Sequence, residues 1–562
     1  MISISGKNWE EIKANHRLVE KIKIENNLNE IQSKLVLSRN YSKEEIYLIK
    51  NHIELNNPFQ KRKDFLSACE LLKINIKKKG KILIIGDYDV DGCMSTILLV
   101  NFLKKIKSDV NYYIPDRFKD GYGASKRLIT SLTKQHDPDL LILLDCGSNS
   151  FEAINYLREK NIQTLIIDHH NTTEHYPQSD VFINPQKTND NYKFKYLCAS
   201  YLTYLFIDLY IKINKLNYPI KDQLILVLVA TVADVMPIRD INKFLAKKVL
   251  NDFDVNKNIS FKHLLKILNI KRKLELHDIG FKIAPLINAA GRITNANQVV
   301  ELFTTSSTEK IKNILENIFY LNEKRKFIEK KILNDLDYKT FYNEEGIIFF
   351  YKPNLHEGII GIIASRIKEY FNKPCLVLTN SKNIIKGSAR STSNFNIGKY
   401  IEKSLKLGLV ISGGGHNLAA GVSLDKKKLN LFKNYINKNY DSKIYKSKNI
   451  FTSTILLDAI NMNFANSIET IGPFGNKNTR PIFLLQNVKF TKQTINNNYV
   501  ECFVKKGVKM IKSISFHHIK SKINYEILNS NNNFDVFIKI KINKWNNKSS
   551  IGLEIIDLIK KN

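Results

Sequence analysis

One stretch of sequence, KILIIGDYDVDG at residues 81–92, decides the expected fold. Its apolar half has the length and β-branched content of a strand buried on both faces, as in a parallel sheet with helical crossovers. Two later runs of the same kind are Leu140 to Leu144 and Thr164 to Ile167. The residues that follow the three runs are Asp87, Asp89 and Asp91, then Asp145, then Asp168, His169 and His170. We therefore expect a doubly wound parallel sheet with polar groups gathered at one edge.

The position of these polar groups predicts a metal centre. In parallel sheets, ligands bind outside the carboxyl ends of the strands, so five aspartates and two histidines would meet there. Carboxylate oxygens and imidazole suit a pair of divalent cations such as magnesium or manganese. Two such ions clamp a phosphoryl group for in-line attack by water. The pattern therefore indicates a metal-dependent phosphoesterase.

A calcium loop is the alternative for the first motif, because Asp-x-Asp-x-Asp-Gly also occurs in calcium-binding turns. The twelfth position of such a loop would need a glutamate, and this chain has Leu98 there. Asp234 favours the metal centre independently, because it follows the apolar segment Leu224 to Ala233. An unpaired charge in such surroundings would be strongly destabilising.

Length and composition favour a multidomain protein that binds a polyanion. The chain has 562 residues, too many for one core, and a net charge of +33. Its bias toward Lys, Asn and Ile is also typical of an AT-rich genome, so a basic surface without a partner is the alternative. Six scattered cysteines without a Cys-x-x-Cys pair, and an N-terminus without a signal-peptide pattern, lead us to expect a cytoplasmic location and no membrane.

Pattern changes divide the chain into five expected segments of an α/β multidomain protein. They are an N-terminal helical segment (1–75), a doubly wound α/β domain (76–305), a connecting helix (306–342), a second α/β domain (343–445) and a small all-β barrel (446–562). Three local elements are also expected: a helix over Met94–Ile106, a capping box at Ser306–Glu309 and a strand over Leu409–Ile411.

Four ordered motifs give the chain a family resemblance. They are Asp87-Tyr88-Asp89-Val90-Asp91-Gly92, Leu144-Asp145-Cys146-Gly147, Asp168-His169-His170 and Thr231-Val232-Ala233-Asp234-Val235-Met236-Pro237. In order and spacing they resemble the motifs of the DHH phosphoesterase superfamily, and within it the chain is most similar to the RecJ exonucleases. The resemblance implies a parallel-sheet DHH domain, a DHH-associated domain that binds phosphate and substrate, and a C-terminal OB-fold barrel that binds single strands.

The resemblance also implies roles for the residues of the metal centre. The expected metal ligands are Asp89, Asp91, Asp145, His169 and Asp234, with Asp145 placed between two ions. Asp87, Asp168 and His170 are then expected to support catalysis, by orienting ligands or by contacting the substrate.

Glycines and cations further along the chain are the expected grip on the substrate. Ser388 and Arg390 should face the same side of an extended segment, and Gly413-Gly414-Gly415-His416 is either a tight turn or a place where backbone approaches a phosphate. With the resemblance, this predicts a substrate-binding set: Arg117, Tyr122, Arg292, His356, Ser388, Arg390, Gly414, Gly415 and His416. Its arginines would bind a terminal 5′-phosphate. Arg366 is either a further contact or an ordinary salt-bridged helix residue.

The barrel offers aromatic candidates for base stacking, although most of them are expected in its core. They are Phe474, Phe483, Tyr499, Phe503 and Trp545, and the candidate cations are Lys477, Arg480 and Lys505.

The resulting expectation is a 5′ to 3′ exonuclease specific for single-stranded DNA. It would release 5′-mononucleotides in repair and recombination, with two divalent cations, magnesium or manganese. A phosphodiesterase of short oligonucleotides or cyclic dinucleotides and a non-catalytic nucleic-acid scaffold are the alternatives; the barrel argues against the first and the filled ligand positions against the second. Single-stranded DNA is the expected partner, a single-strand-binding protein and a helicase are further partners that the resemblance suggests, and we expect a monomer.

Overall fold

The computed structural model describes residues 1–561 except for 122, 173–174, 189, 337–340, 342–345, 393–394, 441–447, 497–498, 519–520 and 546–547. The chain forms two compact units. The first unit combines Met1–Tyr113, Gly123–Ala284 and Lys448–Asn562, and the second combines Ile114–Tyr122 and Pro285–Ser447. Within the described ranges, no helix has the length and apolar character needed to cross a membrane.

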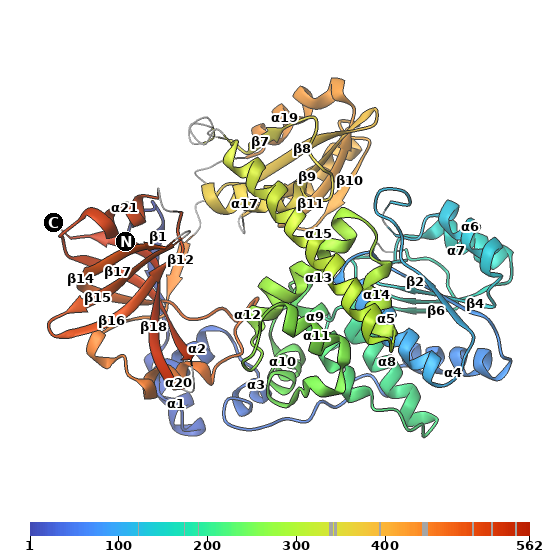
Figure 1. Ribbon diagram of the computed structural model, residues 1–562, viewed down its shortest axis with the longest axis horizontal. Coiled ribbons are helices and arrows are strands. Elements are labelled where there is room, and N and C mark those ends of the chain that lie inside the picture. Colours follow the sequence, from blue (N-terminus) through green and yellow to red (C-terminus); the bar gives the residue numbers. More distant parts are fainter. Residues whose placement is uncertain are drawn as a thin grey trace. The chain divides into compact units, whose positions relative to one another are not determined.

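One part of the first unit is built on a parallel sheet of five strands, some of which are labelled in Figure 1. In spatial order its strands are β3 (Val110–Tyr113), β2 (Ile82–Gly86), β4 (Leu140–Leu144), β5 (Gln163–Ile167) and β6 (Val181–Ile183). All residues of β2 and β4 are buried, as expected for strands with helices on both faces. Gly86 pairs with Leu144, which pairs with Ile167, so the three central strands end at the same level.

Helices pack on this sheet and continue beyond it. They are α4 (Lys63–Lys77), α5 (Val90–Lys105), α6 (Lys126–His136), α7 (Phe151–Glu159), α8 (Ala199–Ile213), α9 (Leu224–Ala233), α10 (Asp240–Asp252), α11 (Ile259–Ile267) and α12 (Leu276–Asp278). A π-helical turn, Ile279–Ile283, leads from α12 into α13 (Ala284–Ile293), which belongs to the second unit from Pro285 onward. The apolar face of α6 and α7 packs on alternate strand residues such as Leu83 and Leu143. α5 packs against α8 and α9, which makes α9 the buried helix that its apolar sequence predicts.

The C-terminal part of the first unit is a closed barrel. Its strands are β13 (Ser453–Ile455), β14 (Phe483–Asn496), β15 (Tyr499–Lys506), β16 (Lys509–Ser515), β17 (Phe534–Trp545) and β18 (Lys548–Lys560), accompanied by α20 (Met462–Glu469) and α21 (Lys522–Asn529). The sheet order is β13-β14-β15-β16-β18-β17, and β14 also pairs with β17, which closes the ring. The predicted small all-β barrel is therefore confirmed.

The N-terminal segment packs against the barrel. It contains β1 (Asn8–Glu11), α1 (His16–Asn26), α2 (Glu30–Ser38) and α3 (Lys43–Tyr47), and β1 pairs in parallel with β12 (Lys448–Phe451). Trp9 stacks on Phe537 at 4.2 Å between ring centroids and donates a hydrogen bond to Asp557. The segment is thus not purely helical, since its first regular element, β1, is a strand that forms a two-stranded sheet with β12.

The second unit contains a mixed sheet in the order β10-β11-β9-β8-β7. The strands are β7 (Ile348–Tyr351), β8 (Cys375–Ser381), β9 (Ile384–Arg390), β10 (Ser412–Gly415) and β11 (Ala419–Leu424). Its helices are α14 (Asn297–Thr304), α15 (Thr308–Asn334), α17 (Ile360–Phe371), α18 (Ile397–Lys406) and α19 (Leu429–Lys438). α15 is the long helix expected between the two α/β regions, and it packs on α14 and α17.

Three local expectations need correction. α5 begins at Val90 and not at Met94, because the side chain of Asp89 caps it and accepts hydrogen bonds from the backbone of Asp91 and Gly92. α15 is capped by Ser307, whose partner is the backbone N–H of Lys310, so the capping box with Glu309 does not form.

The third correction concerns the end of α18. Leu409–Ile411 is not a strand, because Gly408, with φ of +65°, turns the chain away from the helix. The strand β10 begins instead at Ser412 and contains the glycine run. A side chain at Gly413 would put its Cβ 2.7 Å from Ile401, which explains why a glycine lies against α18.

Lys243 of α10 predicts an unusual dependence of stability on pH. Its side chain is 1% exposed, its ammonium lies 3.9 Å from the ring centroid of Tyr41, and no described group accepts a hydrogen bond from it. Burial lowers the pKa of Lys243 to about 7, despite the opposing charge of Glu45. Since the unfolded chain holds this proton up to the usual lysine pKa, stability should rise with pH between about 7 and 10.4.

The variant Lys243→Met should therefore stabilise the protein at pH 6 and lose part of this pH dependence. We expect its unfolding midpoint at pH 6 to exceed that of the wild type by roughly 2–4 °C, with a smaller difference at pH 9.5. Thermal unfolding at both values checks this. Lys248→Met, in the same helix but paired with Asp252 near the surface, is the matched control and should behave like the wild type. An equal gain at both pH values would contradict the explanation.

Candidate metal centre and anion site

The carboxyl ends of β2, β4 and β5 bring the predicted acidic residues together. Asp87, Asp145 and Asp168 each directly follow one of these strands, and the strands end in register. β2 and β4 are neighbours, although β3 lies between them in sequence, so the order of connection reverses at this point. Such switch points are where ligands bind in open α/β sheets.

The start of α5 fixes the next two carboxylates. Asp89 is held as the helix cap, with Oδ1 2.8 Å from the backbone nitrogen of Asp91. The carboxylate of Asp91 accepts hydrogen bonds from the backbone nitrogens of Ala199 and Ser200, at 2.7 and 2.8 Å, where α8 begins. Gly92 permits this arrangement, because a Cβ there would lie 2.4 Å from the backbone of Asp87.

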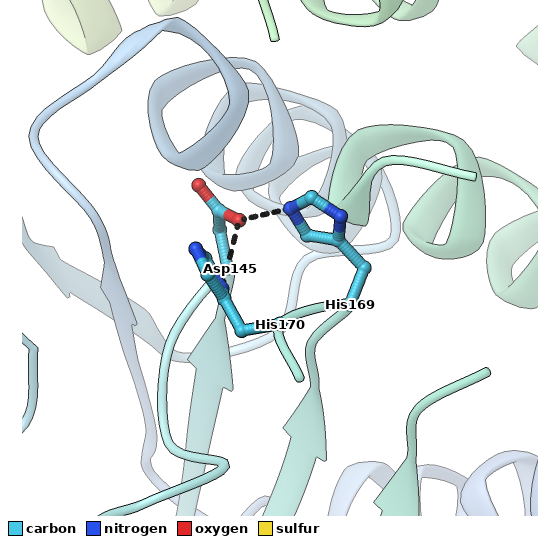
Figure 2. Close-up of side chains that lie close together, drawn as sticks. All are labelled: Asp145, His169 and His170. Carbon is cyan, nitrogen blue, oxygen red and sulfur yellow. Dashed lines mark ion pairs between the residues drawn. The ribbon is translucent and has the colours of Figure 1, made fainter. Parts of the chain in front are cut away.

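Asp145 lies at the centre of the cluster. Figure 2 shows the imidazole rings of His169 and His170 both turned toward its carboxylate. Oδ1 of Asp145 is 3.2 Å from Nε2 of His169 and 3.9 Å from Nδ1 of His170. The backbone of Asp145 has φ of +61°, a left-handed conformation that aspartate and asparagine adopt more readily than most residues.

The carboxylate of Asp168 is hydrogen-bonded to His170. Its Oδ1 is 2.7 Å from Nδ1 of His170, and its Oδ2 accepts a hydrogen bond from the backbone of Ser148. Burial alone would raise the pKa of Asp168, but the hydrogen bond and charge of His170 hold it well below its usual value. Burial would likewise lower the pKa of His170, and Asp168 raises it to about 9. Asp168 therefore orients a positively charged imidazole.

Asp234 reaches the centre from the end of α9. Its Oδ2 lies 3.5 Å from Nε2 of His169. The helix ends in a Schellman motif, with Val235 bonded to the carbonyl of Val232 and Met236 to that of Thr231. Val235 occupies the left-handed position, with φ of +55°. Glycine is usual there, and a β-branched residue costs about 1–2 kcal/mol.

The chemistry of this cluster fits divalent cations. Three groups of residues could each hold a cation, because within each group the donor atoms lie within 4.8 Å of one another. The groups are Asp145–His169–His170, Asp91–His169–Asp234 and Asp87–Asp89–Asp145. Burial raises the pKa of Asp145 well above its usual value, and the neighbouring carboxylates raise it further. Asp145 and Asp234 each have a buried carboxylate oxygen to which no described group donates a hydrogen bond. Bound cations would offset the repulsion between these carboxylates and would coordinate those two oxygens.

Two residues outside the predicted ligand set occur in these donor groups, Asp87 and His170. His170 is hydrogen-bonded to Asp168, which raises its pKa to about 9, so Asp87 is the candidate ligand that the geometry adds. Asp87, expected only to support catalysis, lies with Asp89 and Asp145 in one of the three donor groups. His169 suits a metal because burial and the charge of His170 lower its pKa, which leaves the imidazole neutral. All five predicted ligands occur in these groups.

The second unit contains a cluster of polar groups around Ser388 and Arg390 of β9. Ser388 and Arg390 lie on the same face of the strand, as predicted, and Nη1 of Arg390 donates to the hydroxyl of Ser388 at 3.0 Å. The start of α17 approaches them so closely that a Cβ at Gly361 would lie 3.0 Å from the guanidinium of Arg390. Backbone N–H groups at a helix start and an arginine together favour an anion.

Other predicted residues gather around this point. His356 lies in the loop before α17, in edge contact with Phe118 at 5.4 Å between centroids. Arg292 donates to the carbonyl of Gly358 in the same loop, at 3.3 Å. Burial lowers the pKa of Arg390, and the positive charge of Arg117 lowers it further. A bound anion would offset the repulsion between these two arginines.

The glycine run and Gly421 of β11 form an open strip that leads to Ser388. Gly414 pairs with Gly421, which pairs with Ser388, and directly paired residues share a face of the sheet. A Cβ at Gly414 or Gly421 would meet nothing within 4 Å. Gly415 and His416 follow at the exposed end of β10. The run is thus an edge strand and not a tight turn, and Tyr122 lies outside the described residues.

The remaining candidates divide between core and surface. Phe483 is fully buried, while Tyr499 and Phe503 are half-buried on the barrel. Arg480 lies 4.5 Å from the ring centroid of Phe474 and pairs with Glu469, and Arg366 pairs with Glu329 as an ordinary helix residue would. The side chain of Trp545 is among those not described.

Sequence reasoning missed the residues that hold these groups in place. They are Ser148, Asn184, Ala199, Ser200 and Gly361. Asn184 donates to the hydroxyl of Ser148 and to the carbonyl of His170, at 2.8 and 2.9 Å. Of these residues, only Gly361 could have been singled out from the sequence, because it belongs to the glycine-containing segment His356-Glu357-Gly358-Ile359-Ile360-Gly361 before an expected helix.

Comparison with known proteins agrees with this architecture. Family models match in the order DHH family, N-terminal domain (residues 81–231), DHHA1 domain (343–441) and RecJ OB domain (453–557). This order defines a protein of the DHH class with a DHHA1 domain and a barrel. Curated relatives named single-stranded-DNA-specific exonuclease RecJ include one from Bacillus subtilis, 25% identical over 98% of this chain and 70% of its own length. One from Haemophilus influenzae is 28% identical over 88% of this chain and 90% of its own length.

A solved structure has the same fold. The RecJ of Thermus thermophilus, in complex with Mn²⁺, superposes with a TM-score of 0.84 over 99% of this chain and 80% of that chain, at 21% identity. The chain is thus similar to RecJ exonucleases over nearly its whole length.

Proposed function

We propose that the protein is a single-stranded-DNA-specific exonuclease that hydrolyses phosphodiester bonds in the 5′ to 3′ direction and releases 5′-mononucleotides. The observation that carries the proposal is the gathering of buried carboxylates and a neutral histidine at the ends of three in-register strands. The relatives' name, single-stranded-DNA-specific exonuclease, supplies the substrate class.

We assign the metal-binding role to the predicted ligands, Asp89, Asp91, Asp145, His169 and Asp234, with Asp87 as a further donor. The cations would be two magnesium or manganese ions, which when bound neutralise the phosphate charge and lower the pKa of the attacking water. Asp168 keeps His170 in one orientation through Nδ1 and raises its pKa to about 9, so the charged ring also carries a proton on Nε2. His170 would donate this proton in a hydrogen bond to a phosphate oxygen.

The cluster on β9 would bind the terminal 5′-phosphate. Arg390 and Ser388 offer donors, the start of α17 offers backbone N–H groups, and Arg117, Arg292 and His356 lie around them. The strip at Gly414 and Gly421 would admit the sugar-phosphate backbone without steric conflict. Preference for a 5′ end follows from a site that needs a phosphate monoester.

The barrel would bind the strand beyond the cleavage site. Tyr499 and Phe516 have ring centroids 5.9 Å apart, and Lys541 lies 5.7 Å from the ring of Phe516, which is 58% exposed. Aromatic rings beside cations are the usual single-strand platform. The monomeric state, the cytoplasmic location, the domain boundaries, and the single-strand-binding protein and helicase as partners stay predictions.

A digestion of end-labelled DNA tests this proposal. From a 5′-labelled strand of thirty nucleotides, the label should appear first as a mononucleotide, whereas a 3′-labelled strand should shorten stepwise. Blunt duplex should resist. Faster cleavage of a dinucleotide than of the long strand would favour the oligonucleotide phosphodiesterase instead, and no cleavage with either magnesium or manganese would contradict an enzyme.

A further inference from the structure

The turn that follows Asp234 is held by the barrel. Asn476 belongs to the loop before β14, and its side-chain amide donates a hydrogen bond to the carbonyl of Val235. Its own backbone carbonyl accepts a hydrogen bond from the backbone of Ile238 at 2.8 Å. One residue of the barrel domain therefore brackets the turn from Val235 to Ile238 on both sides.

Packing reinforces these hydrogen bonds. Ile238 is 2% exposed, and Gly475 lies against it so closely that a Cβ at residue 475 would be 2.5 Å from its Cγ1. The loop is itself anchored by Asn478, whose amide donates to the carbonyl of Pro473 at 2.9 Å and whose Oδ1 accepts from Arg39 at 2.7 Å. The bracket is thus part of a fixed structure and not an isolated surface contact.

The turn needs such support. Val235 is in the left-handed region, with φ of +55°, where a β-branched side chain is strained. It directly follows Asp234, so relaxation of Val235 would rotate the end of α9 and move the carboxylate that lies 3.5 Å from His169. A strained residue persists only where its surroundings hold it.

We propose that Asn476, with Gly475, is a positioning residue of the metal centre: the barrel loop holds Asp234 in place through the turn at Val235. The strand-binding domain is thereby coupled to the cation site. This inference rests on the proposed metal centre.

The test is Mn²⁺ binding to the metal-free full-length protein, measured by titration calorimetry without DNA. Asn476→Ala should weaken Mn²⁺ binding by about tenfold, as for other residues that orient metal ligands. Gly475→Ala, which pushes Ile238 away, should act in the same direction. Asn529→Ala removes a comparable bond, from an exposed asparagine to the carbonyl of Tyr525, and should bind Mn²⁺ like the wild type.

A second measurement separates strain from general loosening. In a Val235→Gly background, where the left-handed turn is unstrained, Asn476→Ala should weaken Mn²⁺ binding less than threefold. DNA binding in EDTA should be unchanged in Asn476→Ala. Wild-type Mn²⁺ affinity in both Asn476→Ala and Gly475→Ala would overturn the inference, whereas failure of the wild type to bind Mn²⁺ would overturn the metal centre itself.

Discussion

The variant Asp145→Asn should release nucleotides at least about 1,000-fold more slowly than the wild type with either Mn²⁺ or Mg²⁺, a loss of about 4 kcal/mol in transition-state stabilisation. Asp145 belongs to two of the three donor groups, as does His169, so its removal affects more of the centre than the removal of any other carboxylate. Asparagine tolerates the left-handed backbone at this position, so the turn should stay intact. Nucleotide release under single-turnover conditions, together with DNA binding in EDTA, measures the effect.

The same substitution should stabilise the metal-free protein. Burial and neighbouring acids raise the pKa of Asp145, so its ionised form opposes folding at neutral pH. Asp137→Asn is a matched control, because Asp137 also has a left-handed backbone but its side chain is 91% exposed. It should keep full activity and an unchanged unfolding midpoint. Normal turnover by Asp145→Asn would end the assignment of the metal centre.

The variant Arg390→Gln should lose most of its preference for a 5′-phosphate. We expect the specificity constant kcat/KM on a 5′-phosphorylated strand to fall about 100-fold, because a buried charge-assisted contact is lost. A strand with a 5′-hydroxyl should change less than about threefold, since it has no monoester for the guanidinium to bind. Steady-state kinetics on the two strands give the ratio.

Folding should not account for this loss. The charge of Arg117 and burial both disfavour the charged form of Arg390, so a neutral side chain there should leave stability equal or higher. Arg158→Gln, at an exposed position where the arginine contacts Gln178, is the control and should keep the wild-type ratio. An equal loss on both strands would show that Arg390 acts on chemistry or strand binding in general.

Local pattern was sufficient to predict much of the fold. Strands such as β2 and β4 are apolar along their whole length because both faces are buried, and this composition is visible without a structure. The acids that follow them could be assigned to one edge because parallel strands must end on the same side. Ser388 and Arg390 could be placed on one face because side chains alternate along a strand.

Other features needed the folded structure because they depend on residues distant in sequence. The glycine run was open to interpretation as a turn, and only its pairing with β11 made it an edge strand that Gly421 separates from Ser388. Asp87 became a candidate ligand through its distance to Asp145, which no spacing in the sequence encodes.

By itself the sequence determined the strands, their acidic ends and the order of the domains, because these follow from periodicity and composition over short windows. Only the tertiary structure decided which carboxylate holds His170, which backbone groups hold Asp91, and that a barrel loop supports the turn after Asp234. The physical reason is that hydrogen bonds and packing between distant segments depend on the three-dimensional path of the chain. Local sequence propensity does not determine that path.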